Sequence, residues 1–175
     1  VDIVKNSDYV WFSHEHPDHF NPPNLKIFDN NAKFIFQKTK DKRVVNFLSK
    51  ISNNVIEASS NHSIKLADNF FIKVFPFQDI DSFCLITINN KKILNLNDCD
   101  IKSEHELNEI KNKVGDVDIL FGQFSYAIGK SNRSEKNNRM SLSKDILDNL
   151  SHVISVLKPN FFVPFASFCY FSHLE

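Results

Sequence analysis

The sequence predicts an α/β sandwich of mixed sheets, and three observations carry this prediction. Short apolar segments that resemble strands alternate with helical segments in the first third of the chain. A run of strand segments joined by tight turns follows, and an amphipathic helix over Leu142 to Leu157 comes near the end. Strands, hairpins and intervening helices in this order are typical of a single mixed domain, here residues 1–175.

The first third is predicted to contain three strands and two helices. Pro22 and Pro23 mark the start of a helix, because proline is tolerated in the first turn, and Leu25, Ile27 and Phe28 form its buried side. Apolar residues recur at helical spacing in the second helix. The strands are Tyr9–Phe12, Lys33–Gln37 and Asn54–Ala58, and the second helix spans Asp41–Lys50.

The middle of the chain is predicted to be a series of four strands. Asn89-Asn90 links the last two as a two-residue turn, and asparagine tolerates the positive φ that such turns need. Ser103 and Glu106 then have the spacing of a capping box, which predicts a helix as far as Lys113. The four strands are Ser63–Leu66, Phe70–Phe75, Phe83–Ile88 and Lys92–Leu96.

The last part is predicted to hold two more strands, Val117–Phe121 and Phe161–Pro164, around the helix over Leu142–Leu157. Residues 129–138 are polar and charged without periodicity, so we expect a loop there.

Composition excludes some classes of function. The chain has 21 basic and 21 acidic residues with no block of like charge, which gives no electrostatic reason to expect nucleic acid or a membrane as a partner. Cys84, Cys99 and Cys169 form no Cys-x-x-Cys pair, so we expect free thiols and a cytoplasmic protein. No signal peptide or membrane span is evident. Because Val1 stands close before a motif strand, we expect the chain to be cut from a longer protein.

The most informative segment is His14-Glu15-His16-Pro17-Asp18-His19, directly behind the apolar run Tyr9–Phe12. Imidazole and carboxylate groups hold Zn²⁺, Fe²⁺ or Mn²⁺ in sites that activate water. Seven histidines spread at random over 175 residues would rarely place three beside an aspartate in six positions. The segment therefore predicts a metal site on a loop at a strand end.

A second candidate lies behind another apolar strand, where Asp98 or Asp100 could bridge two metals. The alternative is that Asp100 or Ser103 caps the next helix. We expect Asp98 to be the ligand and Asp100 the cap. His173 is either a further ligand or a packed residue. Three other histidines are expected to be solvated: His62, His105 and His152.

No other chemistry is indicated by the sequence. It has neither a Gly-x-Ser-x-Gly nucleophile elbow nor a glycine-rich phosphate loop. Catalysis would have to come from the metal centre.

The segment from His14 to His19 resembles the HxHxDH motif of the metallo-β-lactamase superfamily. The resemblance implies an αββα fold, here incomplete at both ends. It also implies that His14 and His16 hold one metal, that Asp18 and His19 hold a second, and that Asp98 bridges them. The superfamily places a further histidine before Asp81-Ser82, and Gln78 and Asp79 are the two candidates to replace it. His173 would replace another expected histidine, because Ala166 occupies that position.

Later segments resemble CMP-N-acetylneuraminate monooxygenases, in which a Rieske iron–sulfur domain accompanies such a fold. They include Asp81-Ser82, Lys92–Asn95, Asp98-Cys99 and Pro164–Ala166. The resemblance implies a nucleotide-sugar N-acyl hydroxylase with one or two iron ions, served by a Rieske domain or another electron donor. The Cys-x-His and Cys-x-x-His pairs of a Rieske centre do not occur, so that cluster would lie outside this chain.

Two other functions stay open at this point. One is a hydrolase in which Zn²⁺ or Mn²⁺ lowers the pKa of a bound water to about 7 for attack on an ester, phosphodiester or amide. In the hydrolase, as in the hydroxylase, Asp18 and Asp98 would be the catalytic carboxylates, and the substrate would be a small molecule. The other is a binding module that kept the fold and lost part of the site.

Overall fold

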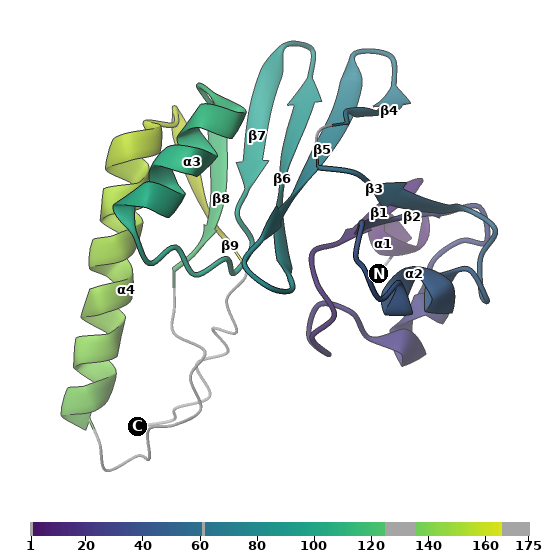
Figure 1. The fold of residues 1–175 in the computed structure, drawn as a ribbon, viewed down its shortest axis with the longest axis horizontal. Coiled ribbons are helices and arrows are strands. Elements are labelled where there is room, and N and C mark those ends of the chain that lie inside the picture. Colours follow the sequence, from purple (N-terminus) through teal and green to yellow (C-terminus); the bar gives the residue numbers. More distant parts are fainter. Residues whose placement is uncertain (1, 61, 125–135, 166–175) are drawn as a thin grey trace. The chain divides into compact units, whose positions relative to one another are not determined.

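The computed structural model describes residues 2–60, 62–124 and 136–165, and the chain divides into two compact units, residues 1–90 and 91–175 (Figure 1). We call them the N-terminal and the C-terminal unit. The six-residue metal motif lies wholly within the N-terminal unit.

The N-terminal unit begins with a parallel sheet in the order β1-β2-β3. Its strands are β1 (Tyr9–Phe12), β2 (Lys33–Gln37) and β3 (Val55–Ala58). Parallel strands need long connections, and these cover the sheet, so the central strand β2 is buried from Phe34 to Gln37. All three strands were predicted.

Antiparallel strands form the second layer of this unit: β4 (Ile64–Ala67), β5 (Phe70–Phe77) and β6 (Asp81–Ile88). Apolar residues from both layers meet in one core cluster, with Ile35 and Ala58 on one side and Ile72, Val74 and Cys84 on the other. Burial of Cys84 raises the pKa of its thiol far above the ordinary value.

A short helix, α1 (Asp2–Lys5), precedes β1. The helical segments η1 (Pro22–Ile27) and α2 (Arg43–Leu48) cover the other face of the parallel sheet. The cluster beneath them is rich in phenylalanine: Phe12, Phe20, Leu25, Ala32, Phe34, Phe36, Val44 and Leu48. The helix predicted from Pro22 is a 3₁₀ helix, and Ile27 is exposed rather than buried.

Helix α2 is shorter than the predicted Asp41–Lys50. Lys42 has a left-handed backbone with φ 56°, and the Asp41 carboxylate accepts a hydrogen bond from the Arg43 N–H. A left-handed residue cannot continue a right-handed helix, so α2 begins only at Arg43.

The C-terminal unit holds three parallel strands in the order β7-β8-β9, with two helices. The strands are β7 (Lys91–Asn95), β8 (Ile119–Gln123) and β9 (Phe161–Phe165), and the helices are α3 (Glu104–Val114) and α4 (Lys136–Leu157). The capping box of Ser103 and Glu106 is confirmed. The predicted loop at 129–138 is wrong for residues 136–138, which are helical, and its remainder lies outside the described residues.

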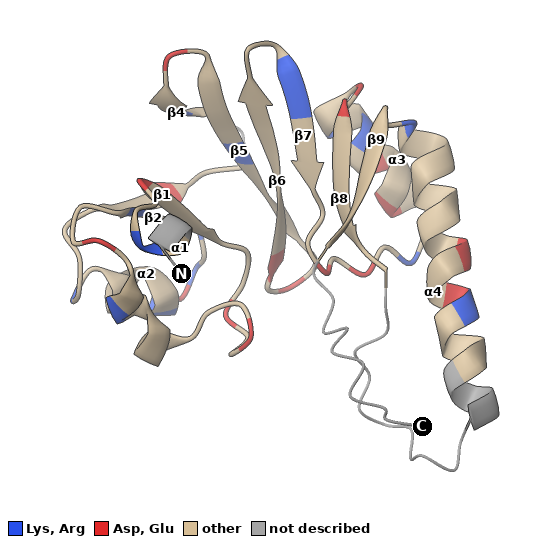
Figure 2. Cartoon of the chain, turned by 180° about the vertical axis from the view of Figure 1, so that it is seen from behind, with Lys and Arg blue, Asp and Glu red and all other residues tan. Residues whose placement is uncertain are grey.

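The predicted turn, two of the cysteines and charged residues of both signs are seen in the described parts of the chain. Asn89 and Asn90 both have positive φ, 47° and 67°, as the predicted turn requires. Cys84 and Cys99 are free thiols, and Cys169 lies outside the described residues. Basic and acidic residues are interspersed over the described parts of both units (Figure 2). Within those parts, no helix combines the length and the apolarity that crossing a bilayer needs.

Candidate metal centre

The motif loop follows β1 and is fixed at both of its ends. Phe12, the last residue of β1, packs edge-on against Phe20 with ring centroids 5.2 Å apart, and both rings are buried. Between them, the His16 carbonyl oxygen accepts hydrogen bonds from the N–H groups of His19 (2.9 Å) and Phe20 (2.7 Å). The motif therefore forms a tight turn whose side chains are gathered at the carboxyl end of a parallel strand.

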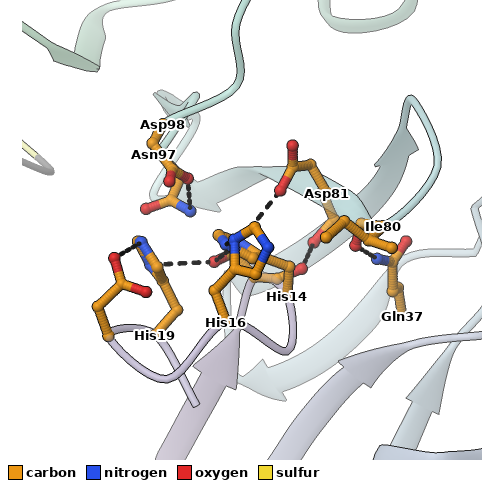
Figure 3. A network of polar contacts seen from close by, with 11 residues as sticks. His14, His16, His19, Gln37, Ile80, Asp81, Asn97 and Asp98 are labelled. Carbon is orange, nitrogen blue, oxygen red and sulfur yellow. Dashed lines mark hydrogen bonds and ion pairs between the residues drawn. The ribbon is translucent and has the colours of Figure 1, made fainter. Parts of the chain in front are cut away.

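His14 and His16 bring two ring nitrogens together. Nε2 of His14 lies 2.9 Å from Nδ1 of His16 (Figure 3). Two nitrogens that each bind one ion at about 2.1 Å are about 3.0 to 3.4 Å apart in octahedral or tetrahedral geometry. The observed separation is close to that range, so this pair fits a shared metal ion.

Asp18 and His19 form a second pair. Oδ2 of Asp18 lies 3.3 Å from Nε2 of His19, within the range for two ligands of one ion. The rings of His14 and His19 are neighbours with centroids 4.3 Å apart, and each offers a ring nitrogen within 4.8 Å of the other. The structure thus brings together all four predicted ligands of the motif.

His14 is held by groups on its other ring nitrogen. Its side chain is fully buried, and Nδ1 lies 3.2 Å from Oδ1 of Asp81 and 3.1 Å from Oγ of Ser13. A carboxylate can only accept, so Asp81 assigns the ring proton to Nδ1 and leaves the lone pair on Nε2. That lone pair is the one a metal requires, and a carboxylate behind a ligating histidine is a common feature of metal sites.

Two hydrogen bonds, one buried and one partly buried, tie the start of β6 to the motif and to β2. Ser82 donates from Oγ to the Ser13 carbonyl oxygen at 2.5 Å, and Gln37 donates from Nε2 to the Ile80 carbonyl oxygen at 2.5 Å (Figure 3). They fix the residues on either side of Asp81. Gln37 is not among the predicted site residues, because its only signal in the sequence is that of a polar residue at the end of an apolar strand.

Gln78 and Asp79, the suggested stand-ins for the missing histidine, lie in the exposed turn between β5 and β6. Gln78 has a positive φ of 49°. The carboxylate from this region that approaches His14 is instead that of Asp81.

In the C-terminal unit, Asp98 is held at the end of β7. Asn97 is buried and has a positive φ of 54°, which asparagine tolerates better than most residues. Its side-chain amide donates to Oδ1 of Asp98 at 2.7 Å, and its N–H donates to Oδ1 of Asn95 at 2.9 Å. These contacts orient the Asp98 carboxylate, whose side chain is partly buried.

Asp100, the predicted cap, and the remaining histidines lie outside the motif loop. Asp100 does not cap α3, because the cap is Ser103; Asp100 is exposed and paired with Lys102. His173 lies outside the described residues. The histidines predicted to be solvated are all exposed, although His152 also pairs with Glu104 of α3: His62, His105 and His152.

Solved structures share this fold. The chain is similar to CmlA, a diiron β-hydroxylase from Streptomyces venezuelae, at 16% identity and a TM-score of 0.65, over 93% of this chain and 36% of that one. It is similar to an isothiocyanate hydrolase from Delia radicum gut bacteria at 13% identity and a TM-score of 0.67, over 93% of this chain and 63% of that one. A metallo-β-lactamase fold protein from Bacillus subtilis, YhfI, is 14% identical with a TM-score of 0.52, over 91% of this chain and 75% of that one.

These likenesses show that the chain has the metallo-β-lactamase fold, as the resemblance of its motif implied. The chain spans 36% and 63% of the lengths of the β-hydroxylase and the isothiocyanate hydrolase. No family model matches the sequence, and no curated protein matches it either.

Proposed function

We propose that the chain is the metal-binding catalytic domain of an enzyme. The observation that carries this proposal is the pair of ligand separations in the motif loop, 2.9 Å for His14 and His16 and 3.3 Å for Asp18 and His19. Four groups with metal-binding chemistry converge within one turn, and Asp81 supports the fully buried member. In a solvated polar loop we would expect His14 to be exposed, whereas its side chain is fully buried.

In this proposal His14 and His16 would hold a first ion, and Asp18 and His19 would hold a second. Asp98 would supply the bridging carboxylate, and the side-chain amide of Asn97 donates a hydrogen bond to that carboxylate. His173, which lies outside the described residues, would be a further ligand. Asp18 and Asp98 would also be the catalytic carboxylates, which orient the group that attacks or is attacked.

The donor set favours iron. With no third histidine, the first ion would have two imidazoles and one carboxylate, which is the set used by non-haem iron oxygenases. The second ion would have two carboxylates and at least one imidazole, a set rich in oxygen. Bound iron would supply activation of dioxygen for hydroxylation.

The proposed reaction is therefore hydroxylation of a small molecule, with a nucleotide sugar carrying an N-acyl group as the substrate class. Two similarities support it: the later segments resemble nucleotide-sugar hydroxylases, and the fold is shared with a diiron β-hydroxylase. Reducing equivalents would come from a Rieske domain or a separate electron-transfer protein.

The experiment incubates the iron-loaded chain with a CMP-linked N-acyl sugar acid, dioxygen and a chemical reductant, and follows the substrate by mass spectrometry. One added oxygen atom, lost in His16→Ala and kept in His105→Ala, would support hydroxylation. Absence of that product from a chain with full iron content, and with several electron donors, would count against it.

A metallo-hydrolase is the second candidate, favoured by the fold shared with the isothiocyanate hydrolase. The same ligands would then hold Zn²⁺ or Mn²⁺, which lower the pKa of bound water. The test is turnover of p-nitrophenyl acetate or bis-p-nitrophenyl phosphate by the zinc-loaded or manganese-loaded chain, abolished by a chelator and by His16→Ala. If neither reaction occurs and less than one metal ion binds, the chain would be a binding module.

A further inference from the structure

Ser13 stands between β1 and the first histidine of the motif, and only 5% of it is exposed. Its backbone carbonyl oxygen accepts the hydrogen bond from Ser82, so the residue is held against β6. A buried hydroxyl is normally hydrogen-bonded. The groups around the Ser13 hydroxyl therefore indicate what this side chain does.

The hydroxyl of Ser13 lies between one histidine of each proposed ion. Its Oγ is 3.1 Å from Nδ1 of His14 and 3.5 Å from Nδ1 of His19. The two rings are neighbours, with centroids 4.3 Å apart. Since His14 is paired with His16, and His19 with Asp18, a single oxygen atom contacts both halves of the proposed metal centre.

The nitrogens that Ser13 contacts are not the ones that would bind an ion. Nε2 of His14 faces His16, and Nε2 of His19 faces Asp18. A neutral imidazole can bind an ion through Nε2 only when its proton is on Nδ1. A hydroxyl oxygen has two lone pairs, so Ser13 can accept one hydrogen bond from each Nδ1–H group. Its place is therefore behind the ligands, where it can orient both rings.

The contact with His19 is the one that adds to the site, because Asp81 already lies 3.2 Å from Nδ1 of His14. Without metal, His19 can donate from Nε2 to Asp18 and accept at Nδ1 from the Ser13 hydroxyl. With an ion on Nε2, the His19 proton is on Nδ1, and the same hydrogen bond runs the other way. The distance of 3.5 Å exceeds the usual range of about 2.7 to 3.2 Å, so we expect it to shorten when metal binds.

We propose that Ser13 is a positioning residue shared by both halves of the metal centre, and that its hydroxyl oxygen accepts the Nδ1–H of His19 as well as that of His14 in the metal-bound chain. The inference rests on the proposed metal-dependent function. It goes beyond that function by naming a residue that links the two ions. Removal of the hydroxyl should weaken metal binding although every ligand is kept.

The test uses Zn²⁺ as the probe, because this ion binds imidazole nitrogen and leaves NMR signals visible. The isotope-labelled full chain is studied at about pH 8, where imidazole is neutral, and the zinc content of the same sample is measured by elemental mass spectrometry. In ¹H–¹⁵N spectra of the imidazole rings, the zinc-loaded natural chain should show Nδ1–H signals for His14 and His19 that exchange slowly with water.

Ser13→Ala should abolish the slow exchange of the His19 signal and keep that of His14, for which Asp81 remains the acceptor. Competition with a coloured chelator should show an affinity for zinc that is lower by about tenfold. The matched control is Ser52→Ala, which removes a hydroxyl that accepts a hydrogen bond in the same unit but outside the motif. This control should change neither the signals nor the affinity.

The outcomes separate the inference from the proposed function. A natural chain that binds zinc, combined with loss of both signals or of neither in Ser13→Ala, would overturn the role of Ser13 alone. An unchanged affinity in Ser13→Ala, or an equal loss in Ser52→Ala, would also overturn it. A natural chain that binds no zinc would refute the metal centre itself, and the inference with it.

Discussion

Oδ1 of Asp81 lies 3.2 Å from Nδ1 of His14, a histidine that has no exposed surface. Asp81 begins β6 and His14 follows β1, so this contact joins two strands far apart in the sequence. It fixes which ring nitrogen carries the proton, and it points Nε2 at the nitrogen of His16. The proposed metal centre depends on that orientation.

We expect Asp81→Asn to weaken metal binding by roughly 10-fold to 100-fold, because the neutral amide holds the His14 proton less firmly. A competition titration with a coloured chelator measures the affinity. ¹⁵N chemical shifts of the imidazole ring should show a loss of the Nδ1–H tautomer. Asp116→Asn, which changes a fully exposed carboxylate paired with Lys111, is the control. An affinity for metal that is unchanged in Asp81→Asn would show that the contact is structural only.

Ser103→Ala should lower the free energy of unfolding by about 1 kcal/mol, since it removes the acceptor for the Glu106 N–H at the start of α3. Urea denaturation followed by circular dichroism measures this change. Ser151→Ala, which removes an exposed hydroxyl within α4, should be nearly neutral. Equal losses in the two variants would argue against a specific capping effect.

Asp118 should contribute a pH-dependent part of the stability. Its carboxylate accepts hydrogen bonds from the Lys91 ammonium and the Lys92 N–H, which hold its pKa below the ordinary 3.8. A lowered folded-state pKa stabilises the fold above the unfolded value, and this stabilisation is lost as the pH falls through the folded value. Asp118→Asn should therefore be less stable than the natural chain at neutral pH, and the difference should shrink progressively as the pH falls below 3.8. Urea midpoints across the pH range test this; a difference independent of pH would refute it.

Cys84 and Cys99 should differ in reactivity. The thiolate is the reactive form, and burial of Cys84 raises its pKa far above neutral, whereas Cys99 is partly exposed. Brief treatment of the folded chain with iodoacetamide should label Cys99 and leave Cys84 unlabelled until a denaturant is added. Peptide mapping by mass spectrometry distinguishes the two sites. Labelling of Cys84 at the rate of Cys99 would mean that the core between the two sheet layers opens readily.

The motif could be predicted from sequence because its geometry is local. His14, His16, Asp18 and His19 lie within one turn behind an apolar strand, and local spacing brings such residues together. The capping box of Ser103 and the turn at Asn89 were predictable for the same reason, since each depends on two residues near each other in the sequence.

Long-range contacts could not be predicted in this way. The roles of Asp81 and Gln37 depend on how β6 and β2 pack against the motif, which no spacing in the sequence encodes. The predicted start of α2 at Asp41 is wrong, because the Asp41 carboxylate accepts a hydrogen bond from the Arg43 N–H and Lys42 has a left-handed backbone. Helical periodicity does not reveal these local contacts. Asp100 is predicted to cap the helix, but Ser103, three residues later, caps α3 instead.

Metal stoichiometry tests the central claim most directly. The full chain is reconstituted with Fe²⁺ under anaerobic conditions, freed of unbound metal and analysed by elemental mass spectrometry. The account predicts one to two ions per chain, with one ion fewer in His14→Ala/His16→Ala or in Asp18→Ala/His19→Ala and no change in His105→Ala. Less than one ion per chain in the natural sequence, or equal metal content in all these variants, would contradict it.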